Sequence, residues 1–231
     1  MTKTRPAAKA AASSRAARAA AAQAETQRAD RRRRIIQWGV GIVVAAVVVS
    51  GLYAVFARSS STAVGKAGYQ VGTPGIGAPA PGFTLAASTG KKISLADYKG
   101  KTVLLYFQEG LTCQPCWDQM TDLEKSAAQV KAAGIDQVLS ITSDPADLIS
   151  QKTQDMKLST PVLSDPGLDV SQQYDANSYG MMGTSRDGHT FVLVGPDGTI
   201  KWRADYGGTP KYTMYVAPDQ LLADLKAGEA K

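Results

Sequence analysis

Residues 101–116 read KTVLLYFQEGLTCQPC, and the rest of the chain is organised around this stretch. Residues 101–108 are mostly aliphatic, β-branched or aromatic, as in a strand buried on both faces. Beyond residue 116, apolar side chains recur at steps of three and four, as on the buried face of a helix: Trp117, Met120, Leu123, Ala127 and Val130. Cys113 and Cys116 are therefore expected where a strand ends and a helix begins.

A pair of cysteines at a helix start has a chemical consequence. Free backbone N–H groups and the helix dipole stabilise negative charge there. A thiolate carries that charge, so the pKa of a cysteine thiol falls below its free value of about 8.5. Pro115 suits the first helical turn, where its missing N–H costs little. The spacing predicts a redox-active dithiol that forms a Cys113–Cys116 disulfide.

Two routes lead to this disulfide. In thiol–disulfide exchange, Cys113 attacks a substrate disulfide and Cys116 then resolves the mixed disulfide. In peroxide reduction, one thiolate becomes a sulfenic acid and the other cysteine condenses with it. Either cycle needs an external thiol reductant, for which a membrane thiol relay is expected, and neither needs a cofactor.

The alternatives for the two cysteines are structural. A zinc site needs about four ligands, whereas the chain has two cysteines and one histidine. A purely structural disulfide across so few residues would constrain the unfolded chain little. The redox dithiol is therefore the preferred interpretation, and no resident metal is expected.

Positive charge is concentrated at the N-terminus. Residues 1–34 contain ten Lys or Arg and two Asp or Glu, a net +8, although the whole chain carries +6. This tail is rich in alanine and has no aromatic residue, so it has little to bury and is expected to be disordered. Basic arms can bind nucleic acid, but the next segment explains the charge better, and no nucleic-acid partner is expected.

Residues 35–57 contain no charged side chain. A helix of this length spans the hydrocarbon core of a bilayer, and Trp38 and Tyr53 lie near its ends, where aromatic rings favour the interface. Four arginines at residues 31–34 precede the segment and only Arg58 follows closely, which predicts a cytoplasmic N-terminus and an extracytoplasmic redox domain. We expect an uncleaved single-pass anchor in the cell membrane; a cleaved signal peptide is the alternative.

The remaining chain divides into a linker and one domain. Residues 58–77 are rich in Ser, Gly and Pro and predict a linker, and residues 78–231 form the folded domain. Strands are expected at 83–85 and 92–94, which form a hairpin, at 101–108 and at 137–142, and a second hairpin is expected at 191–203. A helical turn is expected at 95–98. Helices are expected from the cysteines to 133, at 144–156 with Ser143 or Asp144 as N-cap, at 168–174 and at 218–226. This order predicts a mixed sheet with helices on both faces.

Three blocks of the domain resemble a known family. Residues 80–107 (APGFTLAASTGKKISLADYKGKTVLLYF), 160–174 (TPVLSDPGLDVSQQY) and 190–200 (TFVLVGPDGTI) are similar to the peroxiredoxin, or AhpC/TSA redoxin, branch of the thioredoxin superfamily. The Cys-x-x-Cys motif instead resembles the membrane-tethered thiol-disulfide oxidoreductases of that superfamily. The resemblance implies an α/β, thioredoxin-like fold and an enzyme, either a thiol-disulfide oxidoreductase acting on a protein disulfide or a thiol peroxidase with antioxidant activity.

The motif departs from the peroxiredoxin pattern. Peroxiredoxins carry Thr/Ser-x-x-Cys, in which the hydroxyl group and a distant arginine hold the peroxide. By this resemblance Cys116 takes the peroxidatic position and Cys113 replaces the hydroxyl residue, with Thr112 one residue off. Arg186 lies close to the position of the family's arginine. The loss of the hydroxyl group favours thiol–disulfide exchange over peroxide reduction.

Other side chains are candidates for tuning the pair. Glu109 could move protons or oppose the thiolate by like-charge repulsion, or it is a solvated loop charge. Thr112 could donate a hydrogen bond to the Cys113 sulfur. Trp117 either covers the disulfide or anchors the helix by packing. His189, the only histidine, lies on a segment that the family's geometry places opposite the cysteine loop.

The histidine also supports a hypothesis from another class. Copper-delivery proteins of this fold bind Cu(I) through two cysteines and a distant histidine, and soft ligands suit that ion. Cys113, Cys116 and His189 could supply such a set, although the cysteine spacing is one residue shorter than in those proteins. A non-enzymatic scaffold domain is a further alternative.

Overall fold

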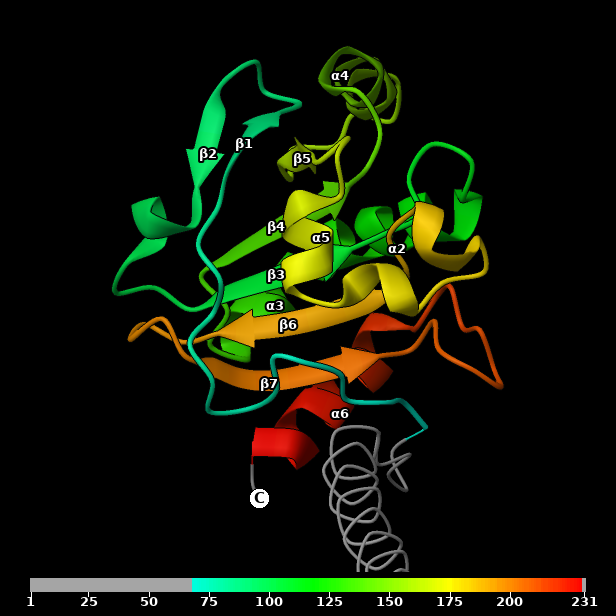
Figure 1. The fold of residues 1–231 in the computed structure, drawn as a ribbon. Coiled ribbons are helices and arrows are strands. Elements are labelled where there is room, and N and C mark those ends of the chain that lie inside the picture. The colour runs from blue at the N-terminus through cyan, green and yellow to red at the C-terminus, as the bar shows by residue number, and fades with distance from the viewer. Residues whose placement is uncertain (1–67, 230–231) are drawn as a thin grey trace, which may run out of the picture. The chain divides into compact units, whose positions relative to one another are not determined.

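The computed structural model describes residues 68–229, and Figure 1 shows their arrangement. The predicted tail (1–34), the predicted membrane anchor (35–57) and residues 58–67 of the predicted linker lie outside the described residues. Within residues 68–229, no helix combines the length and the apolar character needed to cross a membrane.

One seven-stranded sheet forms the centre of the described part of the chain. In sequence order its strands are β1 (Thr84–Ala87), β2 (Lys92–Ser94), β3 (Val103–Phe107), β4 (Gln137–Thr142), β5 (Val162–Ser164), β6 (Thr190–Val194) and β7 (Ile200–Asp205). The helical elements are η1 (Leu95–Tyr98), α2 (Gln114–Lys125), α3 (Ala127–Ala132), α4 (Ala146–Asp155), α5 (Asp169–Gln173), η2 (Ala176–Ser178), η3 (Gly183–Ser185) and α6 (Pro218–Glu229).

The sheet is mixed, as predicted. Its strand order is β2-β1-β5-β4-β3-β6-β7. The three inner strands β3, β4 and β5 are parallel, whereas β1–β2, β1–β5, β3–β6 and β6–β7 are antiparallel pairs. Side chains of α2, α3, α4 and α6 join the core on one face of the sheet, and α5 joins the core on the other.

Strand β3 forms the middle of both cores. All five of its side chains are at most 1% exposed. Leu104 and Tyr106 lie in one hydrophobic cluster and Val103, Leu105 and Phe107 in the other, because successive side chains of a strand point to opposite faces. Burial of each large apolar side chain contributes roughly 1.5–3 kcal/mol. The end of β3, where the cysteine loop begins, is therefore held from both faces.

The helix predicted after the cysteines is interrupted. Helix α2 ends at Lys125, and Ser126 serves both as its C-cap and as the N-cap of α3, with φ −94° and ψ 16°. Serine competes for backbone hydrogen bonds and so favours helix ends over interiors. The apolar period continues through the break, since Leu123 and Val130 belong to the same core cluster.

The linker prediction is wrong for residues 68–77, which pack along β7. Gln70 exchanges two backbone hydrogen bonds with Asp205, at 3.1 and 2.8 Å. The Asp205 carboxylate accepts the backbone N–H of Gly72 at 2.6 Å. A side chain at Gly72 would collide with Arg203, so a residue that suggested a free linker instead permits close packing.

Candidate active site

Cys113 and Cys116 form a disulfide, with an S–S distance of 2.11 Å and Cα atoms 5.3 Å apart. Cys113 is the N-cap of α2 and is 6% exposed, whereas Cys116 is fully buried. The Cys113 Sγ accepts the backbone N–H of Cys116 at 3.3 Å. The sulfur nearer to solvent therefore lies where a helix start stabilises a thiolate.

The loop between β3 and α2 turns at Gly110, whose φ is +85°. A Cβ atom there would collide with the Asp144 carboxylate and the Thr142 hydroxyl group. The Gly110 carbonyl accepts the backbone N–H of Cys113 at 2.9 Å and the indole N–H of Trp117 at 3.0 Å. Both the backbone angle and the close approach require glycine at this position.

Asp144, directly after β4, holds the same loop from outside. Its Oδ2 accepts the backbone N–H of Leu111 at 2.7 Å and the hydroxyl of Thr142 at 3.1 Å. Its Oδ1 accepts Arg186 Nη1 at 2.9 Å, and the same nitrogen donates to the Glu109 carbonyl at 2.9 Å. Asp144 and Arg186 thus fix the main chain that leads to Cys113.

The role of Asp144 differs from the sequence-based prediction. Residues 143–144 were expected to cap the following helix, but α4 begins at Ala146 with Pro145 as N-cap and no side-chain cap. The Asp144 carboxylate is turned to the cysteine loop instead. The only sequence signal is its place at the carboxyl end of a buried strand beside β3, where functional side chains of α/β sheets gather.

The Glu109 side chain is buried, at 6% exposed, so it is not a solvated loop charge. Its Oε1 accepts the backbone N–H groups of Met181 and Met182. These contacts fix the main chain of that segment and leave the two methionine side chains 63% and 53% exposed. Glu109 therefore ties the cysteine loop to a surface segment with exposed apolar side chains.

Thr112 and Trp117 lie differently from each other. The Thr112 side chain is exposed. The neighbouring Cys113 sulfur accepts a hydrogen bond from the backbone N–H of Cys116. Trp117 is fully buried in the core on the α2 face of the sheet, with the Lys152 ammonium 5.7 Å from its ring centroid. This position matches the packing interpretation of Trp117 rather than that of a cover over the disulfide.

His189 is fully buried just before β6. Its Nδ1 lies 3.2 Å from the Tyr106 hydroxyl oxygen, and its Nε2 has no hydrogen-bond partner within the described residues. Burial lowers the pKa of His189 to about 3, so the ring is neutral at physiological pH. Among residues 68–229, no three His, Cys, Asp or Glu side chains are grouped to hold a metal ion. The structure therefore does not bring Cys113, Cys116 and His189 together as a copper site.

Asp187 is a buried carboxyl group that the sequence did not single out. The Ser171 hydroxyl donates to the Asp165 carboxylate at 2.7 Å, and neither Asp187 oxygen has a hydrogen-bond partner among residues 68–229. Burial raises the pKa of Asp187 well above its usual range, and the nearby Asp165 and Asp144 carboxylates raise it further.

The surface beside the disulfide is hollowed. A groove of about 400 Å³ is lined by five residues of α2, the first of them within the Cys-x-x-Cys motif, and by one aromatic side chain: Pro115, Asp118, Thr121, Asp122, Lys125 and Tyr215. The Tyr215 hydroxyl donates to Asp122 at 2.8 Å. The preceding residue, Met214, forms a small buried hydrophobic cluster with the two cysteines.

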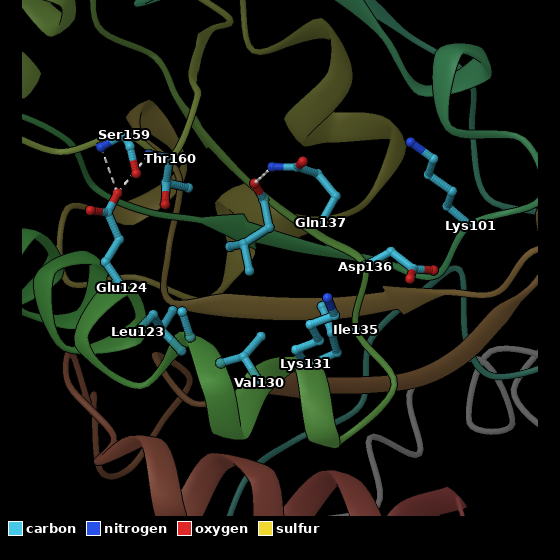
Figure 2. Close-up of a pocket in the computed structure, with 12 residues that line it drawn as sticks. Lys101, Leu123, Glu124, Val130, Lys131, Ile135, Asp136, Gln137, Ser159 and Thr160 are labelled. Carbon is cyan, nitrogen blue, oxygen red and sulfur yellow. Dashed lines mark hydrogen bonds between the residues drawn. The ribbon is translucent and has the colours of Figure 1, made fainter.

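A second hollow, of about 510 Å³, lies at the other end of β3 and β4 (Figure 2). Lys101 lies two residues before β3 and Gln137 begins β4, whereas the cysteines follow the far end of β3. The Glu124 carboxylate in this hollow accepts the backbone N–H groups of Ser159 and Thr160. This hollow is therefore separate from the disulfide site.

Fold and site together define a class. A mixed sheet carries, after its parallel strand β3, a disulfide of two cysteines at the first turn of a helix. This is the arrangement of a thioredoxin-like redox domain.

Comparisons with known proteins agree with this class. The AhpC/TSA family profile matches residues 76–203, and the chain belongs to that family. A putative peroxiredoxin, bcp, of Haemophilus influenzae is 32% identical over 128 residues, covering 54% of this chain and 82% of that protein. The thiol-disulfide oxidoreductase ResA of Bacillus thuringiensis is 32% identical over 100 residues, covering 43% of this chain and 57% of that protein.

Solved structures show the same fold. Peroxidoxin BcpB of Mycobacterium tuberculosis superposes with a TM-score of 0.55 at 18% identity, covering 66% of this chain and 96% of that one. AhpC of Enterococcus faecalis gives a TM-score of 0.56 at 17% identity, covering 67% and 92%. The relatives of the chain include peroxiredoxins and thiol-disulfide oxidoreductases. The chain is therefore an enzyme of the thiol oxidoreductase or thiol peroxidase type.

Proposed function

We propose that the chain is a membrane-anchored thiol-disulfide oxidoreductase that acts outside the cytoplasm through a Cys113/Cys116 cycle. The observation that carries the proposal is the engagement of Arg186. Its Nη1 binds the Asp144 carboxylate and the Glu109 carbonyl, so this donor is committed to the loop. A cysteine stands where peroxiredoxins place the hydroxyl group that also holds the peroxide.

The cycle follows from the positions of the two sulfurs. In the reduced chain, the Cys113 thiolate attacks one sulfur of a substrate disulfide, and the other substrate sulfur leaves as a thiolate. Cys116 then loses its proton and attacks Cys113, which releases the second substrate thiolate. Two electrons pass to the substrate, its thiolates take up protons, and the Cys113–Cys116 disulfide remains. An external dithiol reduces this disulfide by the reverse steps.

The surface beside the disulfide supports a protein as substrate. The groove along α2 begins at Pro115, between the two cysteines. Met181 and Met182 are exposed on a segment tied to the cysteine loop, and flexible methionine side chains suit adaptable binding surfaces. An extended segment of a partner protein would contact the groove and the two methionine side chains while the disulfide of the partner reaches Cys113.

Peroxide reduction is the second candidate, favoured by the relatives named as peroxiredoxins. In that case one cysteine would be oxidised to a sulfenic acid by the peroxide, with release of water or an alcohol. The second cysteine would condense with it and release a water molecule. This cycle ends in the same disulfide.

The test compares oxidants on the full, reduced chain in detergent. Tryptophan fluorescence would follow rapid mixing with insulin, as a protein disulfide, and with hydrogen peroxide; Cys113→Ser and Cys116→Ser variants serve as controls. Exchange with insulin that requires Cys113, and a peroxide rate no faster than that of a free thiol, supports the proposal. A peroxide rate far above that of a free thiol, abolished by only one of the two substitutions, makes the chain a peroxidase.

The anchor is tested separately. The uncharged segment at residues 35–57, with four arginines before it, supports a single membrane span. The full chain should remain in membranes washed with alkaline carbonate, and deletion of residues 35–57 should release it. Release of the undeleted chain by the wash would contradict the anchor.

A further inference from the structure

We propose that Asp144 and Arg186 are positioning residues that set the reactivity of Cys113 through the loop before it. This inference rests on the proposed function, since it assigns a role in the chemistry of the same dithiol. Both residues touch the loop main chain and neither is needed to complete a strand or helix: Asp144 follows β4, and Arg186 lies between η3 and β6.

The first step of the argument is how completely the loop is held. The Leu111 N–H donates to Asp144, and the Glu109 carbonyl accepts from Arg186. The Gly110 carbonyl accepts two further hydrogen bonds, one of them from the Cys113 N–H at 2.9 Å. The main chain from Glu109 to Cys113 is thus fixed by one carboxylate, one guanidinium group and the start of α2.

The second step is electrostatic. Asp144 is 5% and Arg186 27% exposed on the side chain, so their charges are incompletely screened by water. Both lie within hydrogen-bond distance of residues two to four positions before Cys113. While the pair is intact the two charges largely cancel at the sulfur. Removal of either charge exposes the thiolate to the other, with opposite signs.

Other charged or titratable groups near the loop do not reproduce this effect. They are Glu109 within the loop, Asp118 on α2, Asp187 and His189 before β6, and Asp165 after β5. His189 is neutral at physiological pH, because burial lowers its pKa. Asp187 responds to both substitutions, because the Asp144 carboxylate raises its pKa and the Arg186 guanidinium lowers it. Its response opposes the removed charge in each single variant, so it reduces the shift at Cys113 without changing the sign of that shift.

The test measures alkylation of Cys113 by iodoacetamide in the reduced full chain, as a function of pH, with mass spectrometry to locate the label. Asp144→Asn leaves Arg186 uncompensated and should lower the pKa of the thiol, so alkylation below that pKa should be about threefold faster. Arg186→Gln leaves Asp144 uncompensated and should make it about threefold slower. The double variant should return near the original rate.

Two controls separate this role from a purely structural one. Arg186→Lys keeps the positive charge, so Cys113 in this variant should be alkylated at the rate of the unsubstituted chain. Asp197→Asn and Lys201→Gln remove an exposed ion pair of 2.7 Å at the β6–β7 turn and should leave the profile unchanged. Labelling of the buried Cys116 would reveal a variant that does not fold, and the double variant then carries the test.

Shifts of both single variants in the same direction, or no shift, would overturn the inference. The outcome is independent of the exchange assay. If the unsubstituted chain fails to reduce insulin, the proposed function is wrong, while the alkylation profile still shows whether the pair acts on Cys113. If the unsubstituted chain reduces insulin and the alkylation profiles of the Asp144 and Arg186 variants match those of the control variants, only the present inference is wrong.

Discussion

Two arginine–aspartate pairs of this domain differ in burial and in what they hold. Arg203 and Asp205 lie two residues apart on β7, and both side chains are 0% exposed. They are joined through the Arg203 Nε and Nη2 nitrogens, each 2.9 Å from a carboxylate oxygen. Arg186 and Asp144 are 42 residues apart and are joined through a single nitrogen. The first pair fastens residues 68–77 to the sheet, and the second fixes the cysteine loop.

The comparison shows how burial separates a structural pair from one that belongs to a site. Arg203 also donates to the Pro74 carbonyl at 3.2 Å, and Asp205 accepts from Thr190 and Gly72. Buried charges need such complete pairing, because an unpaired charge in the interior is costly. In the second pair Asp144 is buried but the Arg186 side chain is 27% exposed, and both hold the cysteine loop, so we expect this pair to affect stability less and the sulfur more.

The largest expected effect breaks the buried pair. Arg203→Leu leaves the Asp205 carboxylate buried without its partner and should lower the free energy of unfolding by about 3–5 kcal/mol. Arg186→Leu leaves Asp144 two other hydrogen bonds and should cost about 1–2 kcal/mol. Urea unfolding of the two variants measures both values. Equal losses would contradict the distinction between the pairs.

A smaller effect acts on the site without changing a charge. Gly110→Ala forces a side chain against the Asp144 carboxylate at a positive φ and should cost about 2 kcal/mol and slow the exchange reaction. Gly198→Ala is the matched control, because φ is +78° there and no atom lies within 4 Å. It should cost about 1 kcal/mol and leave exchange unchanged. A control variant that also slows exchange would mean that the assay reports stability alone.

The last expected effect concerns the dependence of stability on pH. Because burial raises the pKa of Asp187 in the folded chain, the folded state holds this proton at pH values where the unfolded chain has lost it. Stability from this group is present below the unfolded pKa of about 3.9 and declines as pH rises through the raised pKa. Asp187→Asn should therefore raise the free energy of unfolding at pH 7 and leave it unchanged near pH 3.5. Asp155→Asn, on the exposed end of α4, is the control; an equal gain there, or a gain at both pH values, would contradict the assignment.

Several elements could be predicted because their signals are local. The run at residues 101–108 predicted a buried strand, and β3 (Val103–Phe107) is buried along its whole length. The turn at residues 195–198 predicted the β6–β7 hairpin, which the register confirms. The extent of the linker was missed because the Gly and Pro content of residues 68–77 is equally compatible with a free chain and with close packing. That choice depends on Arg203 and Asp205, more than 120 residues away.

The sequence by itself determined the positions of Cys113 and Cys116 at a strand-to-helix junction, the mixed sheet around them and the redox class of the site. These follow from hydrophobic periods and from spacing within a single turn of helix. Only the tertiary structure decided what surrounds the pair. It placed Asp144 and Arg186 on the cysteine loop, Glu109 on the Met181–Met182 main chain, and His189 fully buried beside Tyr106. The physical reason is that these contacts join segments 33 to 83 residues apart, and no local pattern encodes which distant segment a polar side chain meets.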